Sequence, residues 1–171
     1  MKNAYIYELA ERENLPMAEL LEYARAKGYL TGISGDKVLG ENIPSLLQSF
    51  REYKETKAKI RVLSAKLIIT SGYTIEGYKI VEYVDFVSTE TVMGMGFFKS
   101  IGASFDNMFG SESTLNIKIQ EARELSKSRI KEKAAELDCN AIIGFDIDIT
   151  MFGDSMVGVV CNGTAVKMVP T

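Results

Sequence analysis

The fold is decided by a stretch in the middle of the chain, YKIVEYVDFVSTETV, which runs from Tyr78 to Val92. Within it Ile80, Glu82 and Val84 share one side, and the residues between them share the other. Alternation with a period of two, in a run rich in β-branched and aromatic residues, is typical of a strand. The stretch therefore predicts one long β-strand, with a bulge near Asp85.

Working outward from this strand, the flanking sequence supplies the rest of a domain. Three further runs have strand character: Leu67–Thr70, Ala141–Met151 and Ser155–Met168. Two runs have helical spacing: Phe97–Phe109, and a longer one from a cap at Ser113 to Leu137. The long helix has an apolar stripe made of Leu115, Ile119, Ala122, Ile130, Ala134 and Leu137. Strands on both sides of a block of helices predict an α+β domain, a small antiparallel-rich sheet with two helices on one face.

The N-terminal part has a different pattern. Three short apolar periodicities, punctuated by Pro16, Gly28 and Pro44, predict a small all-helical module over residues 1–50. A charged stretch over residues 51–63 predicts a helical linker, and residues 64–171 form the α+β domain. Residues 1–62 carry a net charge of +1, from 10 Lys and Arg against 9 Asp and Glu, whereas residues 63–171 carry −4, from 10 against 14.

Composition excludes several classes of function. The 171 residues include no His and two Cys, and the formal net charge is −3. A Ser-His-Asp triad, a Cys-His dyad and a His-ligated zinc site therefore cannot be built from this chain alone. Mild acidity argues against binding to nucleic acid or an anionic membrane. The absence of a long apolar run argues against a membrane span, so we expect a cytoplasmic protein.

Three motifs in the C-terminal part resemble the YbjQ-type family, often labelled as heavy-metal-binding. They are TIEGYKIVEY (Thr74–Tyr83), NAIIGFDIDI (Asn140–Ile149) and NGTAV (Asn162–Val166), and the resemblance covers residues 65–169. It implies a subunit that assembles into a ring, typically a pentamer, with two rings stacking in some members to give a decamer. It does not imply an activity, because the family's role is not established.

The chain departs from the family pattern at three positions. The long helix is usually followed by Gly, whereas this chain has Asp138, a residue that tolerates the left-handed conformation better than most. Cys139 stands where the family pattern usually has Ala, and Cys161 where it has an aliphatic residue, so the pattern requires neither Cys and the resemblance does not imply thiolate metal binding by this chain. Residues 5–50 are more weakly similar to the N-terminal helical domain of bacterial translation initiation factor two, carried by Tyr7–Tyr29. That similarity indicates a helical adaptor with a protein partner.

The sharpest candidate site is a pair of carboxylates. In FDIDIT, Asp146 and Asp148 share one face of a strand and lie about 6.6 Å apart. With Glu82 from the long strand they could hold a divalent cation, with further oxygens supplied by neighbouring copies. The alternative is an acidic surface that meets solvent, a channel or another subunit, its charge neutralised by Lys79 or Lys167. Gly94-Met95-Gly96 lacks the third Gly of a dinucleotide-binding loop and predicts a tight turn.

Three functions remain open from the sequence. The first is a non-enzymatic ring, pentameric or decameric, that binds a ligand or partner through the domain, with the N-terminal helices as adaptor. The second is a divalent-metal-dependent enzyme or metal-binding protein that uses the acidic residues of the strand over residues 141–151. The third is a nucleic-acid or ribosome adaptor acting through residues 1–50, against which the near-neutral charge of that part argues.

Overall fold

The computed structural model describes residues 2–31, 35–94, 112–152 and 156–171. The chain divides into two compact units, Met1–Lys59 and Ile60–Thr171. Among the described residues, no helix combines the length and the apolar character that crossing a bilayer requires. The predicted helix at Phe97–Phe109 and the turn at Met95-Gly96 lie outside the described residues.

The first unit is a helical module with a very small sheet. Helices α1 (Ile6–Arg12) and α2 (Met17–Ala26) precede a short 3-10 turn, η1 (Gly40–Asn42), and the start of α3 (Ile43–Lys66). Three two-residue strands, β1 (Ala4–Tyr5), β2 (Leu30–Thr31) and β3 (Lys37–Val38), pair antiparallel in the order β1-β3-β2. The helices follow the sequence prediction, and the strands are an addition to it, since two residues are too few to show a period.

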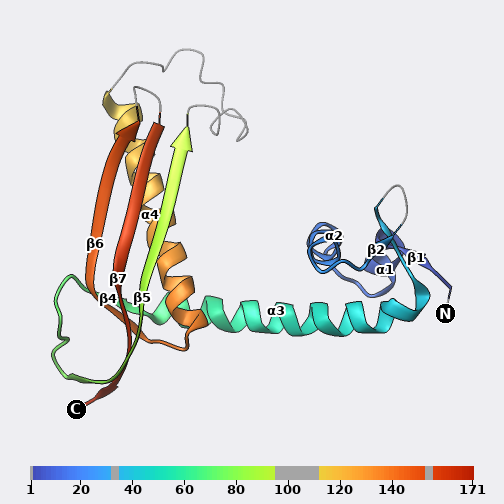
Figure 1. The fold of residues 1–171 in the computed structure, drawn as a ribbon, viewed down its shortest axis with the longest axis horizontal. Helices are drawn as coiled ribbons and strands as arrows, with labels where there is room; N and C mark the ends of the chain where they lie inside the picture. Colours follow the sequence, from blue (N-terminus) through green and yellow to red (C-terminus); the bar gives the residue numbers. More distant parts are fainter. Residues whose placement is uncertain (1, 32–34, 95–111, 153–155) are drawn as a thin grey trace. The chain divides into compact units, whose positions relative to one another are not determined.

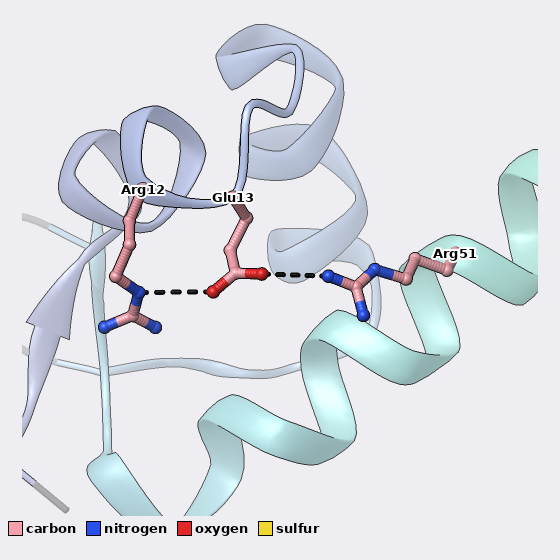
Figure 2. Close-up of polar contacts among 3 residues, drawn as sticks. All are labelled: Arg12, Glu13 and Arg51. Carbon is pink, nitrogen blue, oxygen red and sulfur yellow. Dashed lines mark hydrogen bonds and ion pairs between the residues drawn. The ribbon is translucent and has the colours of Figure 1, made fainter.

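One apolar core holds this unit together. Leu9, Leu20, Leu46 and Phe50 are completely buried in it. Around the core, charged side chains tie the helices together: Glu13, directly after α1, accepts hydrogen bonds from Arg12 Nε at 3.2 Å and from Arg51 Nη2 at 2.8 Å (Figure 2). Exposed ion pairs of this kind contribute little to stability, so the module depends on its apolar core.

The second unit is a four-stranded sheet with one long helix against it. The strands β4 (Ile68–Ile69), β5 (Tyr78–Gly94), β6 (Ala141–Phe152) and β7 (Met156–Pro170) lie in the order β4-β6-β7-β5. Strand β7 pairs antiparallel with both β5 and β6, and β4 is parallel to β6. Helix α4 (Glu112–Glu136) packs across one face of these strands (Figure 1). The α+β class and the antiparallel-rich sheet predicted from the sequence are confirmed.

Three irregularities set the register of the sheet. The pairing of β5 with β7 shifts between Ile80 and Glu82 and again between Tyr83 and Asp85, which confirms the predicted bulge. The pairing of β6 with β7 shifts between Ile143 and Asp146, where Gly144 has a φ of 57°. Strand β7 continues without a bulge, so the alternation of its side chains defines the two faces of the sheet. Val159, Cys161 and Ala165 lie on the helix face, in the core with α4; Asn162 and Val166 lie on the opposite face.

Helix α4 contributes a buried stripe to the helix face. Ala122, Ile130 and Ala134 are fully buried, as the sequence predicts. Leu137 does not belong to the stripe: it lies beyond the last helical residue and its side chain is 37% exposed. The stripe instead includes Ser126, which is completely buried four residues from both Ala122 and Ile130. Asp138 follows with a φ of 57°, the left-handed conformation expected at this position.

Asn140 joins the end of this helix to the sheet. Its Nδ2 donates to the Met168 carbonyl at 2.7 Å, and its Oδ1 accepts from the Met168 N–H at 2.9 Å. The side-chain amide thus pairs with β7 as a peptide group would. This explains the Asn at the start of the motif NAIIGFDIDI, and it fixes where β6 begins.

Candidate functional site

Asp146 and Asp148 project from the face opposite α4. Asp146 pairs with Asn162 and Asp148 with Val160, positions on β7 that alternate with the buried residues of the helix face. Both aspartates are exposed. Two strands across, Glu90 lies in the same row as Asp148, about 10 Å away at the usual strand spacing. The sheet therefore holds a row of carboxylates on one surface, as the sequence predicts for the aspartate pair.

Glu82 does not join this pair. It lies opposite Lys167 on β7, and Lys167 Nζ contacts Glu82 Oε2 at 3.1 Å. Lys167 lies five positions along β7 from Asn162, which corresponds to about 16 Å. Because successive side chains of a strand alternate between faces, this odd separation from Asn162 places Lys167 on the helix face. One chain therefore does not form a single site from Glu82, Asp146 and Asp148. The prediction that these three carboxylates form one site failed for two reasons. The bulges change the register of the strands, and Lys167 neutralises Glu82, which is the alternative that the sequence leaves open.

The edge of the sheet at β5 is covered by cations from α4. Lys133 Nζ donates to the Ser88 carbonyl at 2.7 Å. Arg129 Nη1 donates to the Glu90 carbonyl at 3.4 Å and to Thr91 Oγ1 at 3.2 Å. Strand β5 is the last strand of the sheet, and long cationic side chains on an edge strand discourage unspecific strand pairing. Both cations are exposed, as is Glu90 on β5, whose side chain lies on the opposite face of the sheet.

Behind this edge lies a buried polar cluster that the sequence analysis did not predict. Ser126 Oγ donates to Thr91 Oγ1 at 2.7 Å, and Thr89 Oγ1 donates to the Ser126 carbonyl at 3.1 Å. All three side chains are buried. No buried side-chain nitrogen or oxygen among the described residues lacks a partner, so the cluster is satisfied. The cluster fixes the position of α4 along the sheet. The sequence feature that could have indicated it is the position of Ser126, midway between Ala122 and Ile130 in the buried stripe.

Comparison with known proteins identifies the family to which the second unit belongs. A family profile with the description "Putative heavy-metal-binding" matches residues 67–169, which include the whole four-stranded sheet except Pro170. The chain belongs to this family. The YbjQ family resemblance seen in the three motifs is thus confirmed, and it covers the carboxylate row, Lys167 and helix α4.

The relatives share only this unit. A UPF0145 protein of Bacillus cereus (strain ATCC 10987) is 34% identical over 103 residues, which is 60% of this chain and 100% of the relative. One from Bacillus thuringiensis subsp. konkukian has the same identity and coverage. A crystal structure of a DUF74 family protein of unknown function, from Pediococcus pentosaceus, matches with 20% identity and a TM-score of 0.43, over 60% of this chain and 98% of that one. Because the YbjQ family relatives are matched over their whole length, the rest of this chain has no counterpart in them.

The His and Cys content of this YbjQ family member does not suit a soft heavy metal. The chain has no His, and Cys139 and Cys161 are both unpaired and buried in the apolar core. Burial raises the pKa of both thiols, more than the nearby Lys167 lowers it for Cys139 or the Ser126 hydrogen bond lowers it for Cys161. A thiolate is the form that binds a soft metal. In the described parts of the chain, no three Cys, Asp or Glu side chains gather closely enough to hold an ion.

The buried thiols predict how stability depends on pH. Because the pKa of each thiol is higher in the folded chain, the unfolded chain loses its thiol protons first as pH rises. The contribution of the two thiols to the free energy of unfolding should be constant below about pH 8.5 and should decrease at higher pH. Denaturant titrations between neutral and alkaline pH test this, with Cys139→Ala and Cys161→Ala as controls that should flatten the curve. Equal slopes in all three proteins would contradict it.

Proposed function

We propose that this protein is a non-catalytic, ligand- or partner-binding subunit of a homo-oligomeric ring of five or ten chains, acting in the cytoplasm. Its α+β unit forms the ring, and residues 1–50 act as an adaptor for a protein partner. The observation that carries the proposal is the exposed apolar surface of β5. Unpaired Cys residues favour a reducing compartment, because thiols persist there without forming disulfides.

The apolar side chains of β5 stand out of the sheet on its long outer strand. Tyr83 is 69% exposed, Phe86 66% and Val92 62%, and all three lie on the face opposite α4. Single exposed apolar residues are common, but three large ones on one strand of one face mark a surface that association covers. Strand β5 is the last strand on one side, and β4 pairs with β6 only at Ala141 and Ile142, so among the described residues the rest of β6 has no strand partner on its outer side and a neighbouring copy has access to both. A head-to-tail contact repeated by rotation closes into a ring.

The adaptor role is supported by the way residues 1–59 are organised. They form a compact unit with a core of their own, and the relatives that share the α+β unit have no counterpart of it. An added unit with its own core can bind a partner without disturbing the ring that carries it.

The mass of the protein in solution tests the ring. Light scattering coupled to size exclusion, at micromolar concentration, should give about five or ten times the chain mass of 18.9 kDa. Phe86→Asp should shift the protein to smaller species without loss of helix content, whereas Tyr7→Asp, at an exposed residue of the first unit, should not. A wild-type monomer would overturn the proposal.

A second function, binding of a hard divalent cation, is favoured by the aspartate pair. Asp146 and Asp148 share one exposed face, and carboxylate oxygens suit Mg²⁺, Mn²⁺ or Ca²⁺. A full coordination shell needs more oxygens than two carboxylates supply, so neighbouring copies would contribute the rest. Calorimetry with each cation should give stoichiometric heat that the double variant Asp146→Asn, Asp148→Asn abolishes. No heat with any of the three cations would remove this function.

A further inference from the structure

We propose that neighbouring copies meet through opposite charges, with Asp146 and Asp148 of one chain facing Arg129 and Lys133 of the next. This inference rests on the proposed ring and names its contact surfaces. We call the first surface, Asp146 and Asp148 on β6, the acidic edge. We call the second, Arg129 and Lys133 of α4 at the edge formed by β5, the basic edge.

The two edges lie on opposite sides of the same sheet. Strand β7 separates β6 from β5, and the aspartates project from the face opposite α4 while the two cations belong to α4. Within one chain the two sets of charges therefore cannot neutralise each other. Within the described residues, neither aspartate and neither cation belongs to an ion pair. Asp146 and Asp148 on one edge, and Arg129 and Lys133 on the other, are thus exposed charges of opposite sign.

The cations of the basic edge are held in place and still have donors to offer. Arg129 uses only Nη1 in its two hydrogen bonds, to the Glu90 carbonyl and to Thr91, so Nε and Nη2 remain for a carboxylate. Lys133 uses one of its three donors on the Ser88 carbonyl. Side chains that are already ordered lose less conformational freedom when they bind, which favours association.

The arrangement also explains the direction of assembly. A contact between unlike edges is head-to-tail, and contacts of that type generate rings. Contact between two acidic edges would instead place like charges together, which is unfavourable by several kcal/mol. Opposite charges on the two edges thus favour a ring over a two-fold dimer made through either edge alone.

Charge reversal on each edge, and then on both, tests the inference. Asp146→Lys with Asp148→Lys, and separately Arg129→Glu with Lys133→Glu, should each weaken assembly by more than about 100-fold. The mass in solution should fall at concentrations where the wild type is assembled. The chain that carries all four substitutions should assemble again, because its edges are complementary with the signs exchanged. The reversal Glu11→Lys with Glu76→Lys changes the net charge of the chain by the same amount as the aspartate reversal, at exposed sites that belong to neither edge, and should leave the mass unchanged.

The outcomes separate this inference from the ring itself. A monomeric wild type would overturn both. An assembled wild type whose mass is unaffected by either reversal would overturn the charge pairing and leave the ring intact. Loss of assembly in both reversals without recovery in the fourfold variant would also overturn the pairing. If a reversed chain fails to fold by circular dichroism, Asp146→Asn with Asp148→Asn replaces it, and assembly of that variant should lose the salt dependence of the wild type; unchanged salt dependence would contradict the pairing.

Discussion

Replacing Phe50 with Ala is expected to unfold the first unit while leaving the sheet of the second unit folded. Phe50 is completely buried and is the largest of the fully buried side chains. Truncation of a buried Phe to Ala costs about 3–5 kcal/mol, and a unit of about 60 residues has a stability of only about 3–9 kcal/mol. Its neighbours in the core, such as Leu20 and Leu46, would line a cavity that the small module cannot refill.

Limited proteolysis and circular dichroism would show this result. Cleavage should occur within residues 1–59, with a protected fragment that contains β4 to β7, and the helical signal should drop. Tyr53→Ala is the matched control: the residue lies one turn further along α3, and its ring packs 6.3 Å from that of Phe50, but its side chain is 39% exposed. It should leave the module protected. Equal cleavage of both variants, or of neither, would contradict the prediction.

Replacing Gly163 with Ala is expected to give the largest destabilisation of the second unit from a single added methyl group. A Cβ at this position would lie 2.4 Å from Ile142 Cγ2, closer than real side chains approach, and 3.4 Å from the Ile143 carbonyl. Ile142 is fully buried in the core with α4, and rotation about χ1 is restricted in a β-branched side chain, so Ile142 has little freedom to move away from the added methyl group. Overpacking of this kind costs about 1–3 kcal/mol or more.

A double-mutant cycle isolates the cause. Ile142→Ala removes the atom that Gly163→Ala would strike, so the two changes together should destabilise the unit by less than the sum of the single changes. Urea denaturation measures each free energy of unfolding. Gly72→Ala is the matched control, since its Cβ would meet nothing nearer than 3.4 Å. Additive effects of the first pair would show that the clash with Ile142 is not the cause.

The sequence predicted those features that depend on local pattern. The strand over Tyr78–Val92 and the bulge near Asp85 followed from alternation, whereas the left-handed conformation at Asp138 was implied by the family resemblance, in which Gly is usual at this position. The position of Asp146 and Asp148 on one exposed face also followed, because side chains two apart on a strand share a face.

What the sequence could not predict depends on partners distant in the chain. Glu82 was grouped with the aspartates, but register across β7, altered by three bulges, places it beside Lys167. Ser126 is not part of the apolar stripe predicted for the long helix, yet hydrogen bonds with Thr89 and Thr91 permit it to be buried. Single residues identify neither pairing register nor the partners of a buried hydroxyl, since both are set by the packing of the whole sheet.

The pairing order of the second sheet has a consequence for how the chain folds during synthesis. The core of the first unit uses residues up to Phe50, so it is complete early. Strand β5 ends at Gly94, but its partner β7 begins only at Met156. Strand β4 likewise cannot pair until its partner β6 has been synthesised. Contacts that span so much chain close slowly. While the ribosome completes the chain, the apolar strand β5 stays unpaired after the first unit has folded, and its protection depends on how soon the hairpin of β6 and β7 follows.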